Sequence, residues 1–122
     1  MHALSLNPKP PPMDLSALRE LFGDEDDIVR EILEAYADDL GRNMQEAQDA
    51  TSAQDRKRLA RVAHSLKGAS ANVGATAFAQ VCGDAERRSA TASWAELEDA
   101  TRELTAYAAR VRHWVQDQIT RL

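Results

Sequence analysis

Apolar side chains recur at spacings of three and four residues from Asp14 onward, which is the period of α-helices that bury one face. A short first helix is predicted after Asp14, which can cap it, with Gly23 as its stop and Asp24 as the cap of the next helix. That second helix extends to about Ala50. Its predicted buried stripe consists of Ile28, Ile32, Tyr36, Leu40, Met44 and Ala47.

Three further helices are expected in the rest of the chain. Asp55 can cap a helix that reaches about Val73 and ends at Gly74, and a fourth helix is predicted over about 76–89. Ser93 opens the last helix in a capping-box pattern with a glutamate three residues later. The predicted inner faces are Phe78, Val81, Cys82 and Ala85 in the fourth helix, and Leu97, Thr101, Leu104, Ala108, Val111, Val115, Gln118 and Leu122 in the last.

Short connections between these helices favour packing between neighbours in the chain. The predicted fold is all-α, an antiparallel up-and-down four-helix bundle with a short additional N-terminal helix. The domain is expected to span residues 13–122. All four prolines lie in residues 1–12, and we expect this segment to form an extended tail or linker because prolines cannot continue a helix.

Composition narrows the classes of function. A chain of 122 residues with 43% hydrophobic and 5% aromatic side chains suits one helical domain. The net charge of −5 argues against a general nucleic-acid binder. The single cysteine, Cys82, permits no disulfide framework and favours a reducing compartment. No apolar run approaches the roughly 18 residues of a membrane span, so we expect a cytoplasmic chain that makes no membrane contact.

The helix predicted to begin at Asp55 divides into two faces at about 100° per residue. The apolar face holds Leu59, Val62, Ala63, Leu66, Ser70 and Val73. The opposite face holds Lys57, Arg61, His64, Gly68 and Ala71, with Lys67 at its flank. His64 is therefore predicted to point away from the core, and Lys57 and Arg61 give its face a local positive field on an otherwise acidic molecule.

Two neighbours of His64 suggest chemistry. Gly68 lies one turn away on the same face, and a glycine inside a helix costs about 1 kcal/mol relative to alanine, so we expect a compensating benefit. The missing side chain at Gly68 would let a partner protein approach the imidazole. Ala71, on the next turn, has a small side chain that would not obstruct this approach. Lys67 can reach a group attached to the ring and stabilise an added phosphoryl group. Together these residues predict an exposed nucleophilic histidine beside a flat surface on which a partner protein can dock.

Residues 63–75 read AHSLKGASANVGA and resemble the signature of histidine-containing phosphotransfer (HPt) domains. These domains are helical bundles that relay a phosphoryl group between aspartates of response-regulator receiver domains. The resemblance implies that His64 accepts the phosphoryl group, that Lys67 stabilises it, and that Gly68 provides clearance for the receiver. The remaining motif positions, which the resemblance makes structural, are Leu66, Ser70 and Gly74.

The resemblance also implies a phosphocarrier rather than an enzyme. No glycine-rich ATP-binding motif is present in the sequence, so catalysis is expected from the partner receiver or kinase. No cofactor is expected in this chain, and the divalent metal is assigned to the receiver because no set of carboxylates is apparent beside His64. The implied partners are receiver domains and a hybrid sensor histidine kinase. Docking is expected on the His64 face and the neighbouring surface of the second helix, with the chain as a monomer.

Other interpretations fit the sequence less well. The phosphorylated histidine of kinase dimerisation domains is followed by an acidic residue and later a proline, whereas Ser65 follows His64 and no proline comes after it. The phosphodonor module of chemotaxis kinases shares the signature but needs kinase domains that this chain lacks. A metal or haem bundle is disfavoured because neither His2 nor His113 pairs at helical spacing with a second histidine or within a Glu-x-x-His arrangement. The remaining alternative is a non-catalytic helical module that binds receiver domains without exchanging phosphate.

Overall fold

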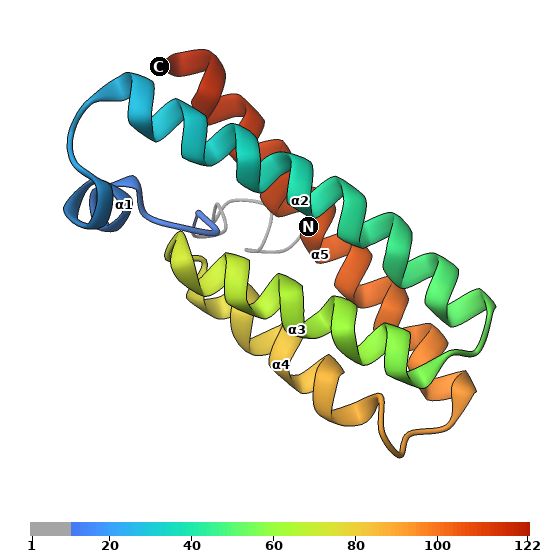
Figure 1. The fold of residues 1–122 in the computed structure, drawn as a ribbon. Helices are drawn as coiled ribbons and strands as arrows, with labels where there is room; N and C mark the ends of the chain where they lie inside the picture. The colour runs from blue at the N-terminus through green and yellow to red at the C-terminus, as the bar shows by residue number, and fades with distance from the viewer. Residues whose placement is uncertain (1–10) are drawn as a thin grey trace, which may run out of the picture.

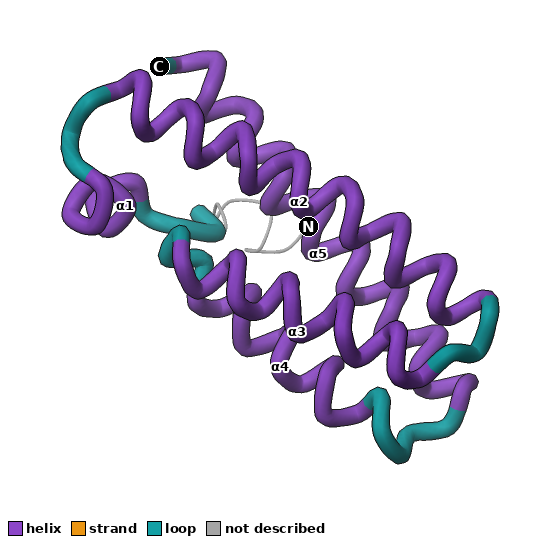
Figure 2. The backbone as a smooth tube through the Cα atoms, in the orientation of Figure 1, coloured by secondary structure: helices purple, strands orange, loops and turns teal. Residues whose placement is uncertain are grey.

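The computed structural model describes residues 11–122, which form five α-helices and no strand (Figures 1 and 2). The helices are α1 (Leu15–Phe22), α2 (Asp26–Ser52), α3 (Arg56–Asn72), α4 (Thr76–Arg88) and α5 (Trp94–Arg121). The first ten residues of the expected N-terminal tail lie outside the described residues. The predicted all-α fold, with a short helix preceding four longer ones, is confirmed.

The four longer helices run up and down in chain order, and each packs against two others (Figure 1). α2 contacts α3 and α5, while α4 contacts α3 and α5 from the opposite corner of the bundle. α2 and α5, of 27 and 28 residues, are much longer than α3 and α4, of 17 and 13 residues. α1 packs on α2 near the end of the bundle where α3 turns into α4 (Figure 1).

The core is filled by apolar side chains from all five helices. Its largest fully buried members are Phe78, Leu18, Leu33, Leu40, Leu66, Leu97, Leu104, Val29, Val111 and Val115. Phe78 packs against the ring of Tyr107, with ring centroids 5.0 Å apart, and so joins α4 to α5. Burial of this apolar surface is the main force that holds the helices together.

The buried stripe of α2 differs from the predicted one at its N-terminal end. Val29 and Leu33 are fully buried, whereas Ile28 is 39% exposed and Ile32 is half-buried. Both stripes have helical spacing and differ by one residue, or about 100° around the helix. Spacing alone could not choose between them, because the choice depends on where α3 and α5 lie against α2.

The inner face of α4 is also displaced from the prediction. Ala79 and Gly83 are buried with Phe78 and Cys82, while Val81 and Ala85 are half-buried. The small residues at 79 and 83 let α4 lie close to α3, with which it makes its most extensive contact. In α5 the stripe from Leu97 to Val115 is buried as predicted, and Gln118 and Leu122 at its end are half-buried.

Three of the predicted helix starts are capped by side chains. The N–H groups of Ser16, Arg58 and Glu96 donate to the side chains of Asp14, Asp55 and Ser93 at 2.8, 3.1 and 3.2 Å. Asp24 does not cap α2, because the chain needs one more residue to turn after Gly23 and the cap position is Glu25. The carbonyl oxygen of Asp24 instead accepts a hydrogen bond from the Arg19 guanidinium at 2.6 Å.

Within residues 11–122, no helix combines the length and the apolar character needed to cross a membrane.

Candidate functional site

α3 presents His64 to solvent because its opposite face is fully occupied by the core. Leu59, Val62, Ala63, Leu66 and Ser70 are all buried, which fixes the rotation of the helix. The predicted outer residues Lys57, Arg61, His64, Lys67, Gly68 and Ala71 are all exposed. The side chain of His64 is 69% exposed, so the predicted orientation of the imidazole is confirmed.

Glu86 of α4 contacts both His64 and Lys67. Its Oε2 atom lies 3.1 Å from Nδ1 of His64, and its Oε1 atom lies 3.6 Å from Nζ of Lys67. An ionised carboxylate only accepts hydrogen bonds, so the geometry suits an imidazole that donates from Nδ1. In the neutral ring this tautomer leaves the lone pair on Nε2. The site is therefore an imidazole, an ammonium and a carboxylate on two adjacent helices.

The sequence interpretation missed Glu86, which lies on α4 and is 22 residues from His64. The available signal was the tight turn around Gly74, because two antiparallel helices joined there bring together residues at similar distances from the turn. The sequence analysis found no carboxylate set beside His64, and the structure places one carboxylate there. Among the described residues, no group of three or more potential ligands could hold a metal ion.

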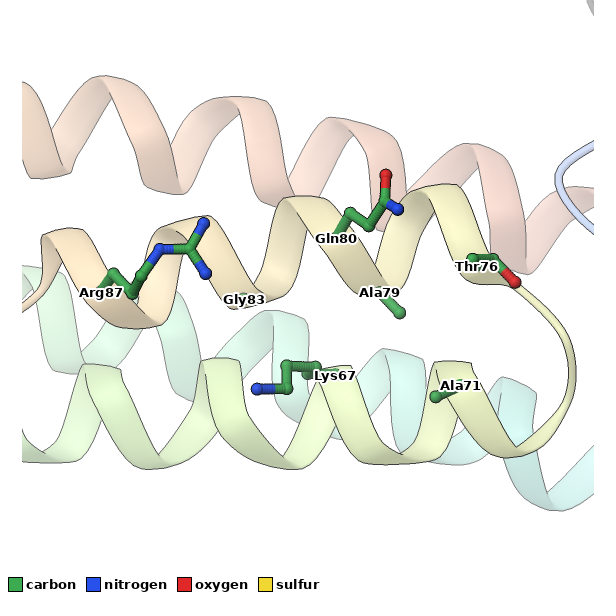
Figure 3. A pocket seen from close by; sticks show the side chains of 7 residues that line it. All are labelled: Lys67, Ala71, Thr76, Ala79, Gln80, Gly83 and Arg87. Atoms are coloured by element: carbon green, nitrogen blue, oxygen red, sulfur yellow. The ribbon is translucent and has the colours of Figure 1, made fainter.

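Lys67 lies in a groove between α3 and α4 (Figure 3). The groove measures about 380 Å³ and is lined by Lys67, Ala71, Thr76, Ala79, Gln80, Gly83 and Arg87. A Cβ atom on Gly83 would lie 3.2 Å from Cδ of Lys67, so this glycine gives the lysine side chain room to lie against α4. No sequence pattern indicates that Gly83 lies against Lys67, because this contact depends on the register of the two helices.

Gly68 has no internal packing reason to be glycine. A Cβ atom at this position would meet nothing within 4 Å. Gly41 is a useful contrast, because a Cβ atom there would lie 3.1 Å from the guanidinium of Arg112. The close approach of another helix, which could have explained Gly68, is therefore not found, and the surface one turn beyond His64 is open.

The other predicted cations lie at different distances from the imidazole. Arg61 lines a depression of about 410 Å³ beside His64 together with Ala60, Ser65 and Glu86. Lys57 lies seven residues before His64, about 10.5 Å along the helix axis, and does not line this depression. The structure thus brings Arg61 and Lys67 to the imidazole and leaves Lys57 at the far end of the face.

The remaining motif residues lie in the core and in the turn after α3. Leu66 is 1% exposed, and the fully buried Ser70 hydroxyl lies 2.7 Å from the hydroxyl of Tyr36 on α2. Burial raises the pKa of Tyr36 to about 12, so its hydroxyl keeps its proton at neutral pH. Gly74 has φ of 83°, a left-handed conformation that glycine adopts without strain. These positions hold α3 against α2 and α4.

Comparison with family models identifies one family, and a solved structure shares the fold. The family model for the Hpt domain matches residues 31–114, which is more than half of the chain. The fold is similar to the crystal structure of histidine-containing phosphotransfer protein B (HptB) from Pseudomonas aeruginosa PAO1, with a TM-score of 0.80 and 24% sequence identity over 93% of this chain and 99% of that one. A comparison with curated proteins found no match.

Proposed function

This chain belongs to the Hpt domain family, the phosphocarriers of phosphorelays, and from that premise we propose that His64 is its phosphoaccepting residue. The observation that supports this most strongly is the environment of the ring. His64 is 69% exposed, its Nδ1 atom is held by Glu86, and a cation lies at Lys67. Nε2 is then the atom that faces an incoming phosphoryl group. Gly68, one turn away, leaves space for the protein that delivers it.

The proposed reaction is a direct exchange between an aspartyl phosphate of a receiver domain and His64. The Nε2 lone pair forms a bond to phosphorus while the bond from phosphorus to the aspartate oxygen breaks, and the electron pair leaves on the carboxylate. The transition state of such transfers is loose, so alignment and charge stabilisation account for most of the catalysis. Lys67 is placed to stabilise the phosphoryl oxygens, and the divalent metal is proposed to belong to the receiver.

The proposed docking surface for the receiver comprises the outer face of α3 and the adjoining part of α2. An apolar groove of about 240 Å³ lies between α2 and the C-terminal part of α3 and is lined by Phe22, Ile32, Ala35, Tyr36, Asp39, Ala69, Asn72 and Val73. Phe22 remains 43% exposed at its edge. Exposed apolar surface next to a reactive group is typical of a binding interface, and Arg61 and Lys57 add the positive charge that suits an acidic receiver site.

We further propose that this chain acts as a monomeric carrier in the cytoplasm. Its catalytic help would come from receiver domains and from a hybrid sensor histidine kinase, since the sequence contains no motif for ATP binding. The family match supports this division of labour, because a carrier needs only an exposed nucleophile and a surface that its partners recognise.

The test is transfer from a phosphorylated receiver to the wild type and to His64→Gln, with His113→Gln as the control because His113 is also an exposed helical histidine. We expect acid-labile, base-stable label on the wild type and on His113→Gln, and none on His64→Gln. If His64→Gln binds the receiver and signals like the wild type, the non-catalytic interaction module is the better description. Label of unchanged amount on His64→Gln would contradict the assignment.

A further inference from the structure

We propose that Glu86 is a positioning residue that holds the nucleophile and the phosphate-stabilising cation together, and releases the cation when the phosphoryl group arrives. This inference rests on the proposed role of His64 and goes beyond it. Glu86 uses its two oxygens for different partners, Oε2 for His64 and Oε1 for Lys67. Its side chain is 30% exposed, whereas those of His64 and Lys67 are 69% and 47% exposed. The carboxylate is thus the best-enclosed member of the three.

The first consequence concerns the tautomer of His64. Free histidine prefers to carry its neutral-ring proton on Nε2, which would leave Nδ1 as the nucleophile. The Glu86 carboxylate can only accept, so a hydrogen bond to Nδ1 favours the opposite tautomer and leaves the lone pair on Nε2. Glu86 contacts Nδ1, so phosphorylation of Nε2 leaves this hydrogen bond in place.

The second consequence concerns the reactivity of the phosphohistidine. When Nε2 bonds to phosphorus, the ring retains its Nδ1 proton and becomes a positively charged phosphoimidazolium. In the return step the Nε2–phosphorus bond breaks, its electron pair goes back to the ring, and a neutral imidazole leaves. Loss of the Nδ1 proton would make an imidazolate the leaving group, which is much poorer. Glu86 faces that proton at 3.1 Å and so keeps the phosphohistidine in its reactive form.

The third consequence concerns Lys67. Its Nζ atom lies 3.6 Å from Oε1 of Glu86, so the two form an ion pair without a close hydrogen bond, which a stronger anion can displace. Gly83 has no side chain that would obstruct the lysine side chain where it lies against α4. A phosphoryl group on Nε2 carries more negative charge than a carboxylate, and it therefore draws Lys67 away from Glu86. The carboxylate keeps the cation near the ring until it is needed.

The tautomer is tested without any phosphotransfer, by ¹⁵N NMR of the histidine rings in the full chain. We expect His64 to be mainly the Nδ1–H tautomer in the wild type and to shift toward Nε2–H in Glu86→Ala. Asp84→Asn is the matched control, because Asp84 is a carboxylate on the same helix that pairs with Arg87 rather than with His64. His113 gives an internal reference. A wild-type ring that is mainly Nε2–H, or one unchanged in Glu86→Ala, would overturn the proposal.

The reactivity is tested by following label from a phosphorylated receiver to His64 and back. We expect Glu86→Gln, which removes the charge but keeps an acceptor, to slow both directions severalfold and to lengthen the life of the phosphohistidine. Glu86→Ala should show a larger change in both quantities, and Asp84→Asn should match the wild type. Wild-type rates and lifetimes in both Glu86 variants would contradict this inference. Absence of label on the wild type would instead contradict the phosphoacceptor assignment, so the two failures are distinguishable.

Discussion

The two faces of α3 have opposite relations to the rest of the molecule. The inner face, which includes Leu59, Val62 and Leu66, is buried against the other helices. The outer face, which includes His64 and Gly68, adds nothing to the core, and a side chain at Gly68 would meet only open space. One helix thus serves stability on one side and, in the proposed function, transfer on the other. Where internal packing does not require the residue type, as at Gly68, contact with a partner protein is the best explanation for it.

The largest expected effect separates the two faces by stability. Leu66→Ala removes a side chain that is 1% exposed and should lower the free energy of unfolding by about 2–5 kcal/mol through lost burial and a residual cavity. Lys67→Ala, at the next position on the exposed side, should change it by no more than about 0.5 kcal/mol. Urea unfolding followed by circular dichroism measures both. Equal losses in the two variants would contradict the division of α3 into faces.

The hydrogen bond between Ser70 and Tyr36 tests the polar part of the inner face. Tyr36→Phe leaves the buried Ser70 hydroxyl without its partner at 2.7 Å and should cost about 1–3 kcal/mol. Adding Ser70→Ala should recover part of this loss, because no unsatisfied hydroxyl then remains. A double-mutant cycle in urea measures the coupling. Additive losses would show that the two hydroxyls do not depend on each other.

Lys67→Ala is expected to act on transfer while the fold stays intact. A hydrogen bond to a charged group contributes about 1.5 kcal/mol at the lower end of its range, so its loss should slow transfer or shorten the phosphohistidine lifetime about tenfold. Rapid-quench transfer from a labelled receiver measures the rate, and Arg102→Ala is the control, because Arg102 is an exposed cation on α5 outside the proposed docking surface. If neither quantity changes, Lys67 has no part in the mechanism.

Gly68 offers a small gain in stability and the sharpest contrast between the faces. Gly68→Ala should stabilise the chain by up to about 1 kcal/mol, because alanine is the better helix former and its Cβ meets nothing within 4 Å. Gly68→Gln should also fold, yet its longer side chain should weaken receiver binding and slow transfer. Unfolding and transfer measured on the same samples give both results. Unimpaired transfer in Gly68→Gln would remove this glycine from the docking surface.

Most of the helices and both faces of α3 could be predicted from the sequence, because the patterns that specify them are local. Helical period, caps at Asp14, Asp55 and Ser93, and the two faces of α3 all depend on residues within a few turns of one another. The errors arose where the answer depends on how helices meet. At the N-terminal end of α2, the prediction buried Ile28 and Ile32 in place of Val29 and Leu33, whereas Tyr36, Leu40 and Ala47 are buried as predicted.

In the candidate site, too, residues on one helix could be predicted together, whereas contacts between two helices could not. His64, Lys67 and Gly68 lie within one and a half turns of α3, so spacing alone brought them together. Glu86 and Gly83 come from α4, and their contacts with His64 and Lys67 are set by the register across the α3–α4 turn. No pattern within either helix specifies that register.

The most direct test of the central claim is to locate the phosphoryl group on the intact protein. The wild type would be phosphorylated by a receiver and analysed at neutral pH by mass spectrometry with a fragmentation method that preserves phosphohistidine. We predict a single modified residue, His64, with His2 and His113 unmodified. A phosphoryl group on another residue, with His64 free of it, would contradict the account.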